Sequence, residues 1–249
     1  MRGAGSLVLV RHGESTANAA QRFTGLLDVG LTYLGEQQAR AAARLLAVSG
    51  SVPDVVLTSP LRRARQTALD IVAELGIDVP VHELWRLEER DYGAITGVGK
   101  RRVWEQYGAD RFVEWRRTVN GRPPAADPEQ IASWNLATGR PQDRRAPGAG
   151  ESLQDVVDRV RPCWEAEIRP GVLGGACVLV VAHGSSLRAL CALIDVLDDA
   201  ELASLIIPPG QPLRYDVDLD GRLLPRGGQF LESRAACARA TPNPSDGRT

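Results

Sequence analysis

Aromatic residues and histidine are scarce in this chain. Aromatic residues make up 5% of the 249 residues, and only three residues are histidine. Proteins that bind single-stranded nucleic acid usually stack the bases on aromatic side chains, so this composition disfavours nucleic acid as a partner. The net charge of −1 also argues against a broadly basic nucleic-acid binder.

Cysteine pairs and long apolar runs are also missing. The four cysteines contain no C-x-x-C pair, and two of them, Cys177 and Cys191, fall in apolar patterns where free thiols behave as small hydrophobic groups. No stretch approaches the ~20 apolar residues that cross a bilayer, and the apolar run before Arg11 is too short for a signal peptide. We therefore expect a cytoplasmic protein with no membrane partner.

The hydrophobic content of 43% is sufficient for one large core. Buried apolar runs predict strands at 7–10, 52–59 and 178–182, with a hairpin over 213–224. Caps and breakers predict helices over 32–48, 60–76, 151–168 (kinked or split at Pro162), 185–196 and 198–206, with a short helix that follows 100–102. This alternation predicts the fold class: α/β, a doubly wound, mainly parallel sheet with helices on both faces.

The domain organisation predicted is one catalytic domain over residues 1–234. A lid-like insertion spans about 93–150, because the part from 119 onward is rich in Pro, Gly and Arg and has little periodicity. Residues 235–249 are expected to form a disordered tail.

Two of the three histidines follow apolar runs and precede glycine. His12 comes after 7–10 and Arg11, and His183 comes after 178–182. Ligands of open α/β sheets bind at the carboxyl ends of the strands. The recurrence is hard to attribute to packing, so it predicts a two-histidine site at this edge.

Arginine gathers at the start of the helix predicted from residue 60. Arg62, Arg63 and Arg65 lie in its first turns, where cations oppose the helix dipole. A solvated basic face is one interpretation; a bound anion explains the unfavourable placement better.

Three other chemistries fit less well. Ser185 and Ser186 after a strand resemble a nucleophile elbow, but the histidine of such a triad follows the serine, and no histidine follows His183. A metal site at His12 and Glu14 lacks further ligands of suitable spacing. Nucleic-acid binding has only the basic clusters 100–102 and 116–117 in its favour.

Phosphoryl transfer through histidine fits best. A neutral imidazole can attack phosphorus and hold the group as phosphohistidine. Arg11, Arg63 and a protonated His183 could match the charge on the transferring group without a metal. Glu89 is the leading candidate for the acid and base that serves the leaving and accepting oxygens; its alternative is an exposed loop carboxylate.

The motifs also resemble a known family. They are Leu9-Val10-Arg11-His12-Gly13-Glu14-Ser15, Asn18, Thr24-Gly25, Thr58-Ser59 with Arg63, Arg86 to Gly93, Thr96-Gly97, Lys100, Trp115-Arg116-Arg117, Pro123-Pro124, Glu151-Ser152-Leu153, Ala182-His183-Gly184, Ser186-Leu187-Arg188 and Pro208 to Pro212. Together they resemble the 2,3-bisphosphoglycerate-dependent phosphoglycerate mutases of the histidine phosphatase superfamily, up to about Leu231.

That resemblance implies a role for each matching position. His12 would be phosphorylated, Arg11, Arg63 and His183 would surround the phosphoryl group, and Glu89 would be the acid and base. Contacts to substrate would come from Asn18, Thr24, Gly25, Tyr92, Lys100, Arg116, Arg117, Gly184 and Ser185.

The implied reaction interconverts 3-phosphoglycerate and 2-phosphoglycerate, with 2,3-bisphosphoglycerate as the priming cofactor and no metal. The partner would be a small phosphorylated substrate, and a homo-oligomer (dimer or tetramer) is compatible with the resemblance. The sequence departs from the family at Asp91, where many members carry histidine, at Ser185, where asparagine is usual, and at Pro209, where threonine is usual. The alternative is a histidine phosphatase that hydrolyses a related phosphorylated metabolite.

Overall fold

The computed structural model describes residues 5–136 and 146–231. Within them, a six-stranded sheet has the order β3-β2-β4-β1-β5-β6. The strands are β1 (Ser6–Arg11), β2 (Val55–Thr58), β3 (Val81–Glu83), β4 (Cys177–Ala182), β5 (Pro212–Val217) and β6 (Leu223–Phe230). The first four strands in that order are parallel, and β5 and β6 add an antiparallel edge. The predicted α/β fold with a mainly parallel sheet is confirmed.

Helices connect and cover the strands. They are α1 (Thr16–Ala19), α2 (Tyr33–Val48), α3 (Arg62–Leu75), α4 (Lys100–Arg117), α5 (Pro128–Ala132), α6 (Leu153–Cys163), α7 (Arg169–Leu173), α8 (Gly184–Asp195) and α9 (Asp199–Ser204), with short turns at η1 (Trp85–Leu87), η2 (Gly93–Ile95) and the π-type η3 (Trp164–Ile168). No helix in the described ranges has both the length and the apolar character needed to cross a membrane.

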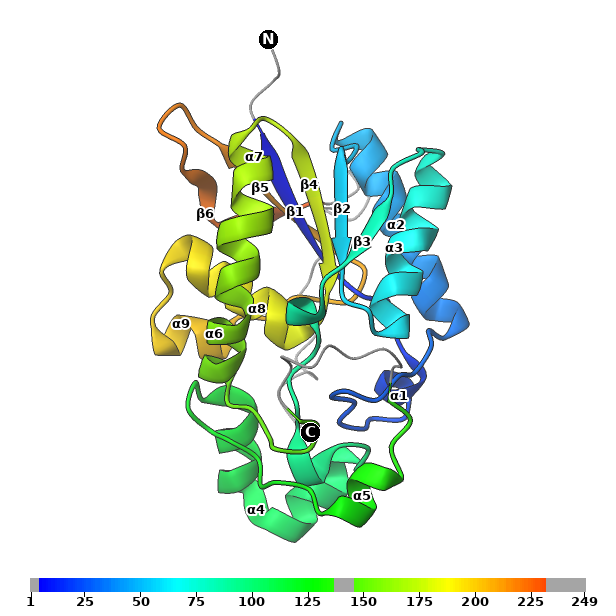
Figure 1. Ribbon diagram of the computed structural model, residues 1–249, viewed down its shortest axis with the longest axis vertical. Helices are drawn as coiled ribbons and strands as arrows, with labels where there is room; N and C mark the ends of the chain where they lie inside the picture. Colours follow the sequence, from blue (N-terminus) through cyan, green and yellow to red (C-terminus); the bar gives the residue numbers. More distant parts are fainter. Residues whose placement is uncertain (1–4, 137–145, 232–249) are drawn as a thin grey trace, which may run out of the picture.

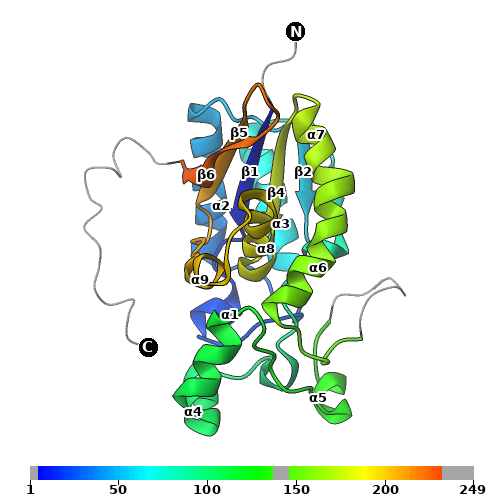
Figure 2. The same cartoon turned by 90° about the vertical axis from the view of Figure 1, so that its left-hand side faces the viewer.

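The strands bury alternate residues on opposite faces, which gives the sheet two cores. Val8 and Val10 pack against α2 and α3, whereas Leu7 and Leu9 pack against α6 and α8. The views in Figures 1 and 2 show these two helical layers on either side of the sheet. Because both faces are covered, the open end for a ligand is the edge where the parallel strands end.

Beyond that edge lie α1, α4 and α5 (Figure 1). A third apolar cluster, which includes Phe23, Phe112 and Trp115, holds α4 in place. The axis of α4 breaks at Gly108, whose φ of 81° and ψ of 165° belong to a region that only glycine adopts readily. The short helix predicted after 100–102 is therefore only the first arm of a longer, bent element, and the second arm, which ends at Arg117, is not predicted from the sequence.

Other boundaries differ from prediction for identifiable reasons. β2 begins at Val55 rather than Val52, because Pro53 cannot donate to the sheet. The predicted split at Pro162 is not observed: Pro162 lies inside α6, and the backbone stays helical through the π turn η3 into α7, so the helical segment ends at Leu173 rather than Ile168. The hairpin is confirmed, but β6 continues to Phe230. The helix α5 was not predicted, although Asp127 and Gln130 form a capping box around Pro128. The predicted tail, 235–249, lies outside the described residues.

The start of α2 packs directly against the loop that follows β1. A Cβ on Gly35 would lie 2.1 Å from the carbonyl oxygen of Glu14, and a Cβ on Gly13 would lie 2.2 Å from the carbonyl oxygen of Gly35. The two backbones can approach this closely only because both positions are glycine. The loop bearing His12 is therefore fixed by backbone contact with a helix.

This close approach predicts that Gly35→Ala is destabilising, although alanine normally favours a helix by about 1 kcal/mol. We expect the free energy of unfolding to fall by about 1–3 kcal/mol, because backbone must shift to admit the methyl group. Urea denaturation measures the change. Gly30→Ala is the control, since a Cβ there meets only the end of the Arg62 side chain, at 3.4 Å. Equal stability of the two variants would contradict the packing argument.

Candidate active site

The pairing of β1 with β4 brings the two histidines together. Arg11 is in register with Ala182, so the residues that follow them, His12 and His183, leave the sheet side by side. The backbone N–H of His12 donates to the carbonyl of Ala182 at 3.0 Å. The two imidazole ring centroids lie 5.0 Å apart, with the rings steeply inclined to each other. The predicted two-histidine arrangement is thus present.

The hydrogen bonds of His12 fix which nitrogen carries its proton. Nδ1 lies 2.7 Å from the carbonyl oxygen of Gly13, which can only accept, so Nδ1 is the protonated nitrogen. Nε2 then carries the lone pair of the ring, and it accepts from Nε of Arg63 at 3.2 Å. Burial, followed by the charges of Arg63 and Arg11, lowers the pKa of His12 well below its ordinary value. The ring is therefore neutral at pH 7, as a nucleophile must be.

His183 is completely buried, immediately before α8. Its Nε2 lies 2.8 Å from the hydroxyl of Ser59, and its Nδ1 has no hydrogen-bond partner among the described residues. The backbone N–H of His183 donates to the Ser186 hydroxyl at 3.1 Å, which anchors the start of the helix. An anion held here would meet both the imidazole and the positive end of a helix.

The side chain of Arg63 is fully buried and held from two sides. It donates to the carbonyls of Leu27, at 2.8 Å, and Gly25, at 2.9 Å, in addition to His12. Burial is the main reason that the pKa of Arg63 falls to about 10, so the guanidinium stays charged at pH 7. Arg11 donates to the carbonyl of Ile207 at 3.2 Å, and its buried Nε has no partner in the described part of the chain.

The carboxylate of Glu89 is 8% exposed. Its Oε1 accepts from the backbone N–H groups of Arg90, at 2.7 Å, and Ser185, at 3.3 Å. Both donors are backbone groups, and among the described residues no side-chain cation forms an ion pair with this carboxylate. The alternative interpretation, an exposed loop carboxylate, is wrong.

A cavity of about 120 Å³ opens in front of His12. It is lined by five cationic side chains and one carboxylate, together with Asn18, Thr24, Gly25 and Tyr92. The cations are Arg11, Arg22, Arg63, Lys100 and Arg116, and the carboxylate is Glu89. Such an excess of positive charge in a small polar cavity suits a strongly anionic ligand.

A second cavity, of about 210 Å³, adjoins the first and shares Arg11, Glu89, Tyr92 and Arg116 with it. Its further lining includes Arg117, Gly184 and Ser185. Every residue that the resemblance assigns to the site therefore borders one of the two cavities, except His183, which is buried behind them.

Two charged residues that line these cavities, Arg22 and Arg188, are not among the site residues expected from the sequence. Arg188 lies four residues after Gly184 in α8, and this helical spacing could have shown that both face the same side. Arg22 lies in a loop without such periodicity, so no sequence pattern marks it. Ser59, which holds His183, was noted only as part of a motif.

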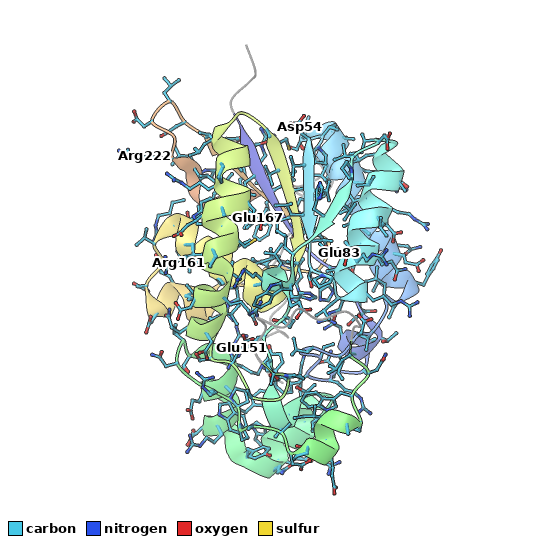
Figure 3. All side chains as sticks on the ribbon, in the orientation of Figure 1. Asp54, Glu83, Glu151, Arg161, Glu167 and Arg222 are labelled. Atoms are coloured by element: carbon cyan, nitrogen blue, oxygen red, sulfur yellow. The ribbon has the colours of Figure 1, made fainter. Side chains whose placement is uncertain are left out.

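One expectation needs correction. Of the arginines that open α3, only Arg63 lines either of the two cavities. Arg65 instead pairs with Glu83 at 2.8 Å (Glu83 is labelled in Figure 3). The protonated His183 expected beside the transferring group stays a prediction. Burial, followed by the charges of Arg63, His12 and Arg11, lowers the pKa of His183 well below its ordinary value.

Asp91, where many members of the family carry histidine, forms hydrogen bonds between two loops. Its carboxylate accepts from the backbone N–H of Gly93, at 2.8 Å, and of Gly148, at 2.7 Å. Burial is the main cause that raises the pKa of Asp91. The residue thus joins the loop that carries Glu89 to the far end of the inserted segment.

Comparison with known proteins agrees with this geometry. The sequence profile of the histidine phosphatase superfamily (branch 1) matches residues 7–135 and 110–223. The chain therefore belongs to the histidine phosphatase superfamily, and within it to the 2,3-bisphosphoglycerate-dependent phosphoglycerate mutases that it matches along almost its whole length.

Two relatives of that name show the extent of the match. The protein from Corynebacterium glutamicum is 44% identical over 238 residues, which cover 95% of each chain. The protein from Cutibacterium acnes is 44% identical over 239 residues, which cover 94% of this chain and 95% of the relative.

Solved structures of the same fold include phosphatases. A mycobacterial glucosyl-3-phosphoglycerate phosphatase in complex with VO3 is 28% identical, with a TM-score of 0.66 over 89% of this chain and 96% of the other. A structure described as mycobacterial hydrolase 1 is 27% identical, with a TM-score of 0.67 over the same shares.

The pKa directions predict that both active-site imidazoles are uncharged in the ligand-free protein at pH 6, where an ordinary histidine with a pKa of about 6.5 is mostly protonated. Ring ¹⁵N shifts measured by NMR in a His82→Gln background report only His12 and His183.

The same pKa directions predict that stability depends on pH. Below about pH 6.5 the unfolded chain binds more protons at these histidines than the folded chain, so the free energy of unfolding should fall as the pH drops. Orthovanadate should protonate His183, because a bound anion stabilises imidazolium. A charged ring without ligand would contradict these assignments.

Proposed function

We propose that this protein is a 2,3-bisphosphoglycerate-dependent phosphoglycerate mutase that interconverts 3-phosphoglycerate and 2-phosphoglycerate. One observation carries the proposal: a neutral His12, with its Nε2 lone pair beside Arg63, borders a cavity of five cations and one carboxylate. The full-length similarity to relatives of this name supports the choice of substrate.

The charge of the cavity suits a bisphosphoglycerate. Each phosphate monoester carries about −1.5 to −2 at pH 7, so two of them with a carboxylate carry roughly −4 to −5. The cations of the first cavity, less Glu89, nearly match this charge, and Arg117 lies in the adjoining cavity. A monoester phosphatase needs only the cations around the transferred group. Lys100, Arg116 and Arg117 are therefore assigned to the carboxylate and the second phosphate.

In the proposed reaction, Nε2 of His12 attacks a phosphorus atom of 2,3-bisphosphoglycerate. The N–P bond forms as the ester P–O bond breaks, and Glu89 gives its proton to the departing oxygen. Arg11, Arg63 and a His183 protonated on binding stabilise the charge of the transferring group. The monophosphate then turns in the site, Glu89 removes the proton of its other hydroxyl, and that oxygen takes the phosphoryl group from His12.

As part of this proposal, the enzyme works in the cytoplasm on a small phosphorylated substrate, as a dimer or tetramer, and needs neither metal, membrane nor nucleic acid. Asn18, Thr24, Gly25, Tyr92, Gly184 and Ser185 complete the substrate contacts. The single domain extends over residues 1–234, with the insertion at 93–150 acting as its lid.

The second candidate is a phosphatase of the same fold, in which water takes the phosphoryl group from His12. The mycobacterial glucosyl-3-phosphoglycerate phosphatase of similar structure is the observation in its favour. Its identity of 28% is well below the 44% of the mutase relatives, so the mutase is the first choice.

A coupled assay of 3-phosphoglycerate with and without 2,3-bisphosphoglycerate tests the proposal. We expect conversion to 2-phosphoglycerate that depends on the primer, and a phosphoenzyme that is stable in base and labile in acid. In His12→Asn both should vanish, because no other nucleophile faces the cavity in the proposed mechanism. Phosphate release without isomerisation would favour the phosphatase, and label that persists in the variant would exclude the phosphohistidine.

Removing the second group of cations should separate the two activities. Lys100→Ala and Arg116→Ala are expected to lower mutase turnover by about 10²-fold or more, since charged groups desolvated at the site lose their partners. Hydrolysis of p-nitrophenyl phosphate, which needs only the cations around His12, should remain measurable.

The matched control for these variants is Arg101→Ala. Arg101 neighbours Lys100, but its side chain is 90% exposed and pairs with Glu105. Its variant should keep both activities. Parental mutase rates in the Lys100 and Arg116 variants would rule out their assigned role.

A further inference from the structure

A buried ion pair lies behind Glu89, outside both cavities. Nε of Arg159, in α6, donates to Oε1 of Glu151 at 3.0 Å, and the two side chains are only 11% and 7% exposed. Figure 3 shows Glu151 near the end of α6 that approaches the loop region. A buried ion pair is weak evidence for stability, because desolvation offsets the attraction. Its geometry points to another use.

The other donors of Arg159 form hydrogen bonds with the backbone of the segment that carries Glu89. Nη1 donates to the carbonyl of Arg86 at 2.6 Å, and Nη2 reaches the carbonyls of Glu88 and Glu89 at 3.2 and 3.4 Å. A planar guanidinium can meet several acceptors at fixed angles, which an ammonium cannot. The backbone before and at Glu89 is therefore held by one side chain from the core.

Glu151 secures the other end of the same segment. Its Oε2 accepts from the backbone N–H of Asp91 at 2.9 Å, and its own N–H donates to the Asp91 carbonyl at 2.8 Å. The backbone N–H of Arg90 lies between the carbonyls bound by Arg159 and the peptide group bound by Glu151, and it donates to the Glu89 carboxylate. A rotation of the peptide between residues 89 and 90 would move the carboxylate that it orients.

We infer that Arg159, braced by Glu151, is a positioning residue for proton transfer by Glu89. The pair fixes the 86–91 backbone so that the N–H of Arg90 orients the carboxylate toward the oxygen that gains or loses the proton. The inference rests on the proposed function, since it requires Glu89 to act as acid and base. Loss of the pair should then impair proton transfer more than phosphoryl binding.

The leaving group makes this distinction measurable. An aryl phosphate such as p-nitrophenyl phosphate departs without needing a proton, whereas an alkyl phosphate requires an acid. The experiment measures the rate of phosphoenzyme formation from a series of aryl and alkyl phosphates at pH 7. The slope of its logarithm against the pKa of the leaving alcohol reports how well the acid works.

Four variants complete the design. Glu89→Gln gives the slope without the acid. Arg159→Gln removes the hydrogen bonds of the guanidinium, and Arg159→Lys keeps the charge beside Glu151 but loses the planar fork. Arg161→Gln is the matched control, because Arg161 lies two residues further along α6 and is exposed (labelled in Figure 3).

We expect Arg159→Gln to slow the alkyl phosphates by about 10²-fold, a typical contribution of a general acid, and to change the rate with p-nitrophenyl phosphate by less than about threefold. Its slope should approach that of Glu89→Gln, with Arg159→Lys between the two and Arg161→Gln at the parental value. If Arg159→Gln does not fold, the slope of Arg159→Lys decides.

Equal losses across the series, or a parental slope in Arg159→Lys, would overturn the inference while leaving the mutase proposal intact. A parental slope in Glu89→Gln would instead refute the acid role of Glu89, and the positioning role with it.

Discussion

The parallel pairing of β1 with β4 is the constraint on which the site depends. Neither histidine is near the other in sequence, and each lies in a loop directly after its strand. The register of Arg11 with Ala182 sets the positions of His12 and His183 relative to each other along the strand direction. A slip of one residue would turn every side chain of β1 to the opposite face of the sheet. Because both faces of this strand are fully buried, the hydrophobic cores enforce the register that the chemistry requires.

The arginines of the site are held mainly by neutral oxygens. Arg63 is anchored by the carbonyls of Gly25 and Leu27, and Arg11 by that of Ile207. Carbonyls fix the direction of a guanidinium without cancelling its charge, so a phosphoryl group meets cations that are ordered before it arrives. Carboxylates in the same positions would compete with the ligand, and their own protonation would make the site sensitive to acid.

Much of this arrangement could be predicted from the sequence, because it depends on local signals. Apolar runs gave the central strands, and the glycine after each histidine marked the ends of β1 and β4. What depends on long-range packing could not be predicted. The lowered pKa of His183 follows from its burial and from the nearby charge of Arg63. Arg63 and Arg65 lie on the same helix, and the sequence does not show that Arg65 pairs with Glu83 of the neighbouring strand. The placement of Arg22 depends on a loop path that no periodicity encodes.

The bend of α4 at Gly108 limits which insertions or deletions α4 can accept. Lys100 and Arg116 are sixteen positions apart and would lie roughly 24 Å apart along a straight helix. Both nevertheless border one small cavity, because the two arms of the element fold back from the glycine. One residue added to either arm would turn its cation by about 100° around the helix axis. We therefore expect α4 to tolerate substitutions at its exposed positions, but not a change in the number of residues on either side of the bend.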